Sequence, residues 1–148
     1  GFRAGLAASL HCGTVNEVDD KLLKDPTSKL VETINSEGGE EASRIKSIVQ
    51  ENMWEGVGIL RDRGGLEKAL STFNSLREVK VSSNTPMEKL LIPMMLDNAE
   101  AVALSAMIRE ESRGAHFRAD FPETKDEWRK RIVLKLQEGE CKVSFIAP

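Results

Sequence analysis

The chain has 148 residues, of which 40% are apolar and 30% are charged, a length and composition typical of one soluble globular domain. The net charge is −3 and both signs are interspersed, which argues against a nucleic-acid partner. The longest apolar run, residues 90–95, is much shorter than the ~20 residues of a membrane span, so we expect no span. No signal segment opens the chain, and two isolated cysteines, Cys12 and Cys141, favour a reduced compartment over a disulfide.

Residues 1–10, GFRAGLAASL, have the composition of a small-residue helix without a capping residue or an initiator Met. We therefore expect a chain cut from a longer protein, with an expression-tag remnant as the alternative. In residues 11–39, Asp25 as N-cap and Pro26 at the first helical position predict a short helix. Its expected buried stripe is Leu30, Val31 and Ile34, and its expected end is at Gly38 and Gly39.

Apolar residues at spacings of three and four, from Ile45 to Leu60, predict a helix over residues 40–62. Gly64 and Gly65 should end it, and a second helix over residues 65–79 should return antiparallel. Gly56 lies inside the first helix, where it indicates close helix packing better than a nucleotide-binding loop.

A third helix is predicted over residues 86–112, because Thr85, Pro86 and Glu88 form the pattern of a capping box. Gly114 should supply the left-handed residue at its end. The helix is apolar on most faces, so we expect it to be central, with Pro93 weakening its first turns. The predicted core contains Ile48, Val57, Leu70, Phe73, Met95 and Val102.

Beyond Gly114 the periodicity changes to two. Residues 132–136 and 143–145 alternate apolar and polar side chains around a turn at residues 138–140, which predicts a β-hairpin. The predicted fold is therefore mainly α, an antiparallel three-helix bundle with a small C-terminal β-hairpin.

The sequence offers little catalytic chemistry. Its two histidines, His11 and His116, are far apart, and no second Cys or His pair stands at metal spacing near His11 and Cys12. No glycine-rich phosphate loop occurs. We therefore assign no catalytic, cofactor-binding or metal-ligating residue. The dense polar segment, residues 109–122, fits either a charge network that anchors the chain after the third helix or a contact surface for a neighbouring domain or ligand.

Residues 111–122, ESRGAHFRADFP, closely resemble a signature of the C-terminal domain in succinate dehydrogenase and fumarate reductase flavoprotein subunits. L-Aspartate oxidase and adenylylsulfate reductase are related. Residues 53–62, MWEGVGILRD, and 95–100, MLDNAE, are similar to further motifs of that family, in the same order. Residues 1–8 are similar to the helix that closes the family's flavin domain.

The resemblance implies a whole protein that carries FAD and interconverts succinate and fumarate, or a related pair, by hydride transfer at the flavin. The family's dinucleotide fingerprint, flavin-linked His and substrate-binding His and Arg belong to upstream segments. The expected partners are the upstream FAD-binding domain and an iron–sulfur subunit of a membrane-associated complex. The expected location is the cytoplasm or the cytoplasmic face of the inner membrane. Arg113, His116, Arg118 and Asp120 are expected to face outward together and to fix the orientation of this domain on the flavin domain.

The expected domain organisation has four parts. Residues 1–10 end a truncated FAD-binding domain, 11–39 connect through a short helix, 40–122 form the bundle and docking segment, and 123–148 form the tail with the hairpin. Alternatives are an L-aspartate oxidase C-terminal domain, a stand-alone helical interaction module and a small independent enzyme. Residues 126–130, DEWRK, favour the succinate dehydrogenase/fumarate reductase type, whereas Pro93 and residues 19–39 depart from the family pattern.

Overall fold

The structure is a computed structural model that describes residues 2–11, 20–137 and 140–147. It divides into two compact units, Gly1–Asn35 and Ser36–Pro148. The pair His11–Cys12, rejected above as a metal site, and the tip of the hairpin turn include positions outside the described residues. Along the chain the elements are α1 (Phe2–His11), α2 (Asp20–Asn35), β1 (Glu40–Glu41), α3 (Ala42–Val57), β2 (Leu60–Arg61), α4 (Arg63–Arg77), β3 (Val81–Ser82), α5 (Pro86–Ile108), β4 (Phe117–Arg118), the 3-10 turn η2 (Asp126–Trp128), β5 (Arg131–Gln137) and β6 (Glu140–Ile146).

The first unit holds α1 and α2. The opening residues are helical as predicted, but α2 begins at Asp20, so the prediction that Asp25 caps a helix starting at Pro26 is wrong. A proline removes only one backbone hydrogen bond, and this helix of 16 residues continues through it. Leu30 and Val31 are 49% and 51% exposed, which contradicts the expected buried stripe within this chain. A helix can bury an apolar stripe only against a second element.

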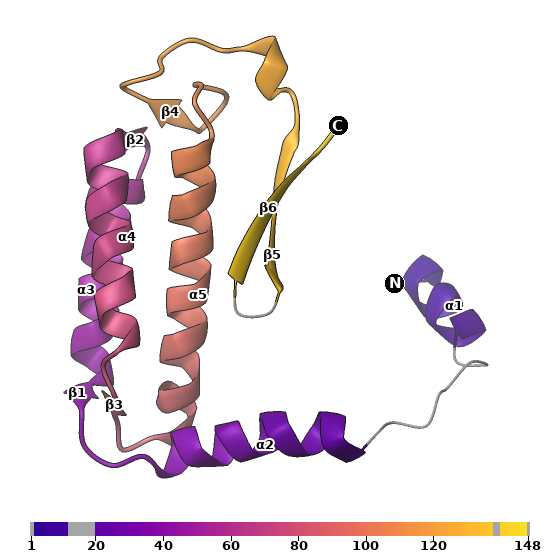
Figure 1. Ribbon diagram of the computed structural model, residues 1–148, viewed down its shortest axis with the longest axis vertical. Helices are drawn as coiled ribbons and strands as arrows, with labels where there is room; N and C mark the ends of the chain where they lie inside the picture. Colours follow the sequence, from indigo (N-terminus) through magenta and orange to yellow (C-terminus); the bar gives the residue numbers. More distant parts are fainter. Residues whose placement is uncertain (1, 12–19, 138–139, 148) are drawn as a thin grey trace. The chain divides into compact units, whose positions relative to one another are not determined.

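In the second unit α3, α4 and α5 lie side by side, and each contacts the other two (Figure 1). The chain reverses direction between α3 and α4 and again between α4 and α5. Phe73 and Val57 are buried as predicted, whereas Val102 is 47% exposed because it lines two open hollows, one beside α3 and one beside β5. Ile48, Leu70 and Met95 pack half-buried against the core, which consists of Ala42, Ile45, Val49, Val57, Leu66, Ala69, Phe73, Leu76, Ile92, Leu96, Ala99, Ala103 and Ala106.

The junction between α3 and α4 differs from the prediction. α3 ends at Val57, because Leu60 and Arg61 leave the helical path and pair with β4 as the short parallel strand β2. Gly64 and Gly65 do not stop a helix. They form the first turn of α4, where the Asp62 side chain accepts a hydrogen bond of 2.8 Å from the Gly65 amide. Gly56 allows this turn to approach α3, since a Cβ on Gly56 would stand 2.5 Å from the Gly65 carbonyl oxygen.

α5 begins at Pro86 as predicted, but Thr85 makes no side-chain bond to the helix backbone. Its hydroxyl donates to the Glu88 carboxylate instead, so the expected capping box does not form. The helix ends at Ile108 rather than residue 112, because Arg109 is extended. Gly114 has the expected positive φ of 58°, but it lies in a separate turn.

Length and composition would allow α5 to cross a membrane, contrary to the estimate from the longest apolar run. Its contacts with α3 and α4 bury one side of the helix, while Leu91, Met94 and Val102 stay exposed.

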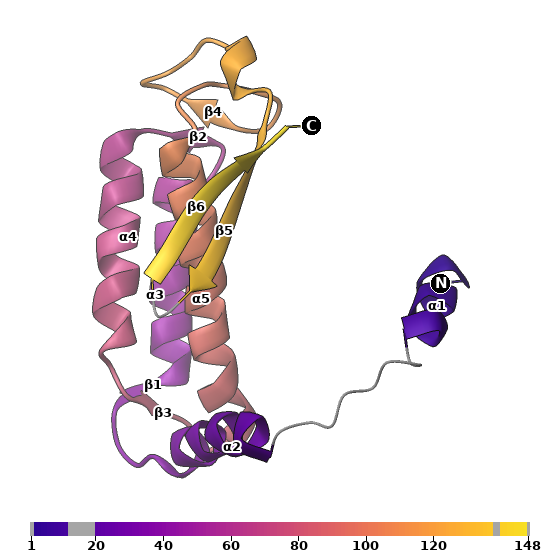
Figure 2. The same cartoon turned by 45° about the vertical axis from the view of Figure 1, so that its right-hand side comes forward.

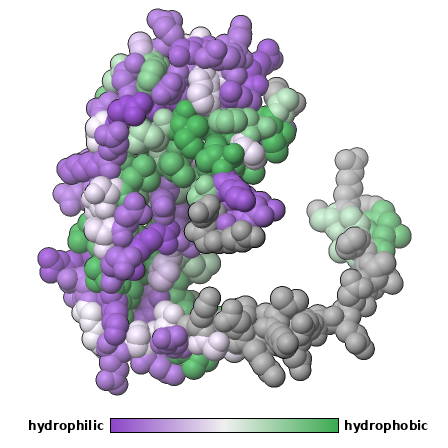
Figure 3. Space-filling model, viewed as in Figure 1, coloured by the Kyte–Doolittle hydropathy of each residue, from purple (hydrophilic) through white to green (hydrophobic). Residues whose placement is uncertain are grey.

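The chain ends in an antiparallel pair of strands, β5 and β6, as predicted, with Leu134 opposite Val143. β5 contacts α5, and both views show the hairpin running alongside this helix (Figures 1 and 2). Trp128 and Phe145 pack edge to face at 5.9 Å between ring centroids and join the 3-10 turn to β6. Hydrophobic surface gathers where the hairpin lies against α5 (Figure 3).

Candidate functional site

Arg118 is the centre of the polar segment after α5. Its side chain is fully buried, although an arginine is rarely buried without partners. Nη1 donates to the carbonyl oxygens of Ala106 and Met107, at 2.7 and 3.0 Å. These belong to the last turn of α5, where helix carbonyls lack helical partners and the helix dipole favours a cation. Arg118 therefore closes the C-terminal end of α5 and does not face outward as the sequence predicted.

Asp120 connects this arginine to a second helix. Its carboxylate accepts from Arg118 Nε and Nη2, at 2.8 and 2.7 Å, and from the backbone amide of Arg63 at 3.1 Å. Arg63 is the first residue of α4, so the carboxylate lies where the helix dipole favours an anion. The pKa of Asp120 is lowered to about 2, mainly because its carboxylate accepts these hydrogen bonds from Arg118. The ion pair thus joins the end of α5 to the start of α4.

A second acid, Glu111, is fully buried and organises the segment that leads toward the hairpin. It accepts from Arg109 Nη1 at 2.7 Å, from Arg113 Nε at 2.9 Å and from the backbone amide of Lys125 at 2.9 Å. Burial alone would raise the pKa of Glu111, but the bonds from Arg113, Lys125 and Arg109 lower it to about 2. Arg109 also donates to the Trp128 and Lys130 carbonyls, at 2.8 and 2.6 Å, and so fixes the chain just before β5.

His116 stands between two arginines. Its Nδ1 lies 2.7 Å from Arg61 Nη1, which only donates, so Nδ1 is the acceptor and Nε2 carries the proton toward the Arg109 carbonyl at 3.3 Å. Burial lowers the pKa of His116, and the charges of Arg61, Arg109 and Arg118 lower it further. The imidazole is therefore neutral at physiological pH and acts as an acceptor for Arg61.

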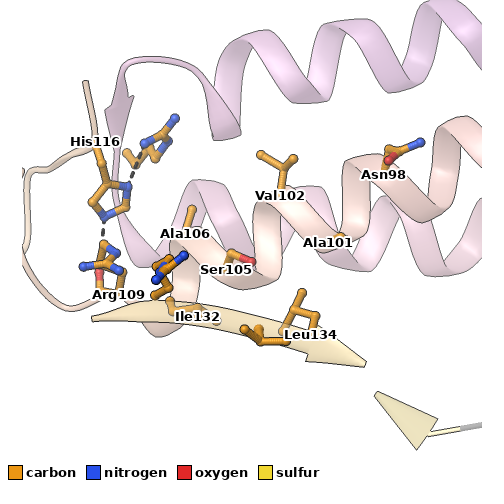
Figure 4. A pocket seen from close by; sticks show the side chains of 12 residues that line it. Asn98, Ala101, Val102, Ser105, Ala106, Arg109, His116, Ile132 and Leu134 are labelled. Carbon is orange, nitrogen blue, oxygen red and sulfur yellow. Dashed lines mark hydrogen bonds between the residues drawn. The ribbon is translucent and has the colours of Figure 1, made fainter. Parts of the chain in front are cut away.

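This histidine lies at one end of an open groove of about 690 Å³ between α5 and β5 (Figure 4). The floor is apolar and is built from Ala101, Val102 and Ala106 of α5 and from Ile132 and Leu134 of β5, which Figure 4 labels. The basic end of the groove contains Arg61, Arg109, His116 and Arg131.

A second hollow, of about 430 Å³, lies between α3 and α5 and is almost entirely apolar. It includes Trp54, Met95, Asn98 and Val102, and it shares the last two with the groove. Trp54 is 85% exposed. The two hollows therefore form one continuous concave surface across α3, α5 and β5, which we call the apolar face.

Among the described residues no group of three or more His, Cys, Asp or Glu side chains could hold a metal ion. Within the same residues the acids of the polar segment are engaged by arginines, and Cys141 is exposed and unpaired. The arrangement therefore supplies fixed charges and apolar surface.

The family described as "Fumarate reductase flavoprotein C-term" matches residues 46–146, a span that includes most of α3, all of α4 and α5, the acids Glu111 and Asp120, and the hairpin. The chain belongs to this family.

Relatives and solved structures agree with the family assignment. This flavoprotein C-terminal domain is 33% identical over 143 residues to one subunit of the fumarate reductase (CoM/CoB) of Methanothermobacter marburgensis, an alignment covering 90% of the chain and 26% of the relative. It is 34% identical over 117 residues to the fumarate reductase flavoprotein subunit of Haemophilus influenzae, covering 72% and 20%. A solved structure of E. coli quinol fumarate reductase FrdA matches with a TM-score of 0.82 at 25% identity, covering 97% of the chain and 28% of that structure. The chain thus spans about a quarter of the length of such relatives.

The four predicted docking residues of this flavoprotein domain occupy different environments. His116 lines the groove, Arg113 is exposed beside Glu111, Arg118 is buried, and Asp120 bridges two helices. The expectation that they face outward together is wrong for Arg118. Sequence reasoning passed over Arg61, although it is the single arginine of the 53–62 motif and lies beside His116. Its strand position was hidden, because the periodicity placed it in a helix.

Proposed function

We propose that this chain is the non-catalytic C-terminal domain of an FAD-dependent flavoprotein subunit of the succinate dehydrogenase/fumarate reductase type. The whole protein would interconvert succinate and fumarate by hydride transfer at the flavin, and FAD would be held by polypeptide upstream of this domain. The domain would contribute by packing against that polypeptide. The observation that carries the proposal is the family match over residues 46–146, together with relatives of which the alignments cover only 26% and 20%.

The apolar face supports a packing role. Trp54 and Val102, which are 85% and 47% exposed, border a hollow with almost no polar surface. Burying one large apolar side chain contributes about 1.5–3 kcal/mol, and contiguous exposed apolar surface marks an interaction site. Within this proposal α3, α4 and α5 act as an antiparallel three-helix bundle that presents the face.

The polar segment takes a supporting role in the same proposal. His116 belongs to the docking surface. Arg118 and Asp120 stabilise the helices that carry this surface, because together they join the end of α5 to the start of α4. Arg113 is the exposed member of the cluster around Glu111. The four residues would thus fix the orientation of the domain, and no proton or hydride would pass through them.

The domain boundaries and partners are part of the proposal. Residues 1–10 would close the FAD-binding domain, 11–39 would connect, 40–122 would form the bundle with its docking segment, and 123–148 would form the tail. An iron–sulfur subunit would complete a complex on the cytoplasmic face of the membrane. The related proteins include the "Mycobacterium smegmatis Sdh1 complex in the apo form", which matches with a TM-score of 0.79 and 26% identity.

L-Aspartate oxidase activity of the whole protein is the second candidate. The chain is 32% identical to the L-aspartate oxidase of Bacillus subtilis, but the alignment covers 93 residues and 62% of the chain, against 90% for the Methanothermobacter relative. Assays of the intact protein with fumarate, succinate and L-aspartate separate these candidates. Turnover of L-aspartate alone would replace the first proposal by the second.

Hydrogen exchange tests the domain role directly. In the intact flavoprotein, the backbone amides of residues 53–61 and 95–106 should exchange more slowly than in the isolated 148-residue chain, because docking covers the apolar face. The intact protein should bind FAD, and the 148-residue chain by itself should not. Rapid exchange across both peptides in the intact protein, or stoichiometric flavin binding by the isolated chain, would contradict the proposed function.

A further inference from the structure

Arg61 has a charge without a matching counter-charge. No carboxylate of the described residues forms an ion pair with it, in contrast to its neighbours Arg109 and Arg118, which pair with Glu111 and Asp120. Its Nε donates to the Val57 carbonyl at 3.0 Å, and Nη1 donates to neutral His116 at 2.7 Å. Burial, followed by the nearby charge of Arg118, lowers the pKa of Arg61. The guanidinium is therefore held in place by two neutral acceptors.

The free side of this guanidinium can accept one particular kind of ligand. Arginine has five N–H donors, and the two bonds use one on Nε and one on Nη1. Nη2 has no acceptor among the described residues, so Nη1 and Nη2 together offer the fork that binds a carboxylate through both oxygens. The backbone around this fork is fixed, because β2 pairs with β4 and the Ala119 amide donates to the Arg61 carbonyl at 2.7 Å.

We propose that Arg61 is the receptor for an Asp or Glu side chain of the upstream polypeptide, in a segment whose apolar side chains fill the groove between α5 and β5. The inference rests on the proposed function and names the chemistry of its docking partner. Charge complementarity carries it: the residues lining the groove include Arg61, Arg109, Arg131 and His116 but no carboxylate. About three quarters of the Methanothermobacter relative lies outside the aligned region. Polypeptide of that kind in the intact protein would supply the occupant.

A small free dicarboxylate fits this groove less well. It would satisfy Arg61 but leave the floor of Ala101, Val102 and Leu134 in contact with water. A polypeptide segment covers both the cation and the floor, and it continues across Asn98 and Val102 into the apolar hollow beside Trp54.

Carbodiimide cross-linking of the intact flavoprotein tests the inference. The amine introduced by Arg61→Lys should couple to an upstream Asp or Glu, which mass spectrometry of the linked peptides identifies. Lys68 and Glu55, 3.7 Å apart, provide an internal positive control in the same sample. Arg44→Lys is the matched control, since Arg44 is exposed and pairs with Glu40 at 3.3 Å within this domain. A residue 61 that stays unlinked while the Lys68–Glu55 link forms, or that links only to this domain, overturns the proposal.

Hydrogen exchange of Arg61→Gln gives a second reading. Loss of a charged hydrogen bond should speed exchange of residues 95–106 in the intact protein at least ~10-fold at low salt. The increase over the unsubstituted protein should shrink at high salt, because salt also weakens the pair that this variant lacks. Arg44→Gln should leave exchange unchanged, and the inference fails if Arg61→Gln does so too.

If peptides 53–61 and 95–106 are protected but Arg61 has no upstream partner, only this inference fails. If neither peptide is protected, the proposed function fails with it.

Discussion

Replacing Arg118 by Met should strongly destabilise the second unit. The methionine fits part of the same volume but donates no hydrogen bond. The buried guanidinium makes two bonds to Asp120 and contacts the last carbonyls of α5, at 2.7 Å for Ala106 and 3.0 Å for Met107. Removing one partner of a buried ion pair costs ~3–5 kcal/mol, because the remaining charge and the carbonyls lose their partners. At roughly 3–4 °C per kcal/mol, the melting temperature should fall by ~10–20 °C.

Urea unfolding followed by helical circular dichroism measures this loss, and two further variants divide it. Arg118→Lys keeps the charge but lacks the planar fork, so it should lose ~1–3 kcal/mol. Asp120→Asn keeps an acceptor near the Arg63 amide and should lose less than Arg118→Met. If Arg118→Met unfolds within ~1 kcal/mol of the unsubstituted chain, the buried guanidinium contributes little and the reasoning is wrong. An Arg118→Lys variant as unstable as Arg118→Met would assign the effect to the fork instead of the charge.

Three further outcomes are expected from the packing and from the buried acid Glu111. Phe73→Ala should cost ~3–5 kcal/mol in urea unfolding because Phe73 is fully buried, and a neutral result would refute the core assignment. Gly56→Ala should cost ~1–3 kcal/mol, since its Cβ would meet the Gly65 carbonyl at 2.5 Å, whereas Gly64→Ala, with 3.4 Å to its nearest neighbour, should be tolerated. The folded state lowers the pKa of Glu111 from 4.5 to about 2, so its contribution is present above pH 4.5 and is lost as the pH falls toward 2. Melting curves across that range should be less pH-dependent for Glu111→Gln, and an unchanged acid limb would count against the role of Glu111.

The polar segment shows what residue types alone leave open. Residues 109–122 fit both an internal charge network and a contact surface, and the structure assigns different members to each environment. Arg118 and Glu111 are buried in the network, while His116 lies at the groove. Sequence could not separate them, because an arginine near a helix end pairs inward or outward according to which carbonyls and carboxylates the returning chain brings close. Arg61 escaped notice for a related reason: the apolar spacing up to Leu60 continues the helical pattern, and only pairing with β4 ends the helix at Val57.

Local signals in the sequence were sufficient for the helical character of the chain, the start of α5 at Pro86 and the C-terminal pair of strands. Each depends on neighbours close along the chain: apolar spacing, a proline at the first helical position and alternation around a short turn. Tertiary structure decided the helix ends at Val57 and Ile108, the exposure of Val102 and the burial of Arg118. These depend on groups distant in sequence, since β2 needs β4 to pair with it and Arg118 needs the end of α5 and the start of α4 at the same place. Burial of a side chain is a property of the assembled surfaces, and spacing along one helix cannot specify which of its sides the rest of the protein covers.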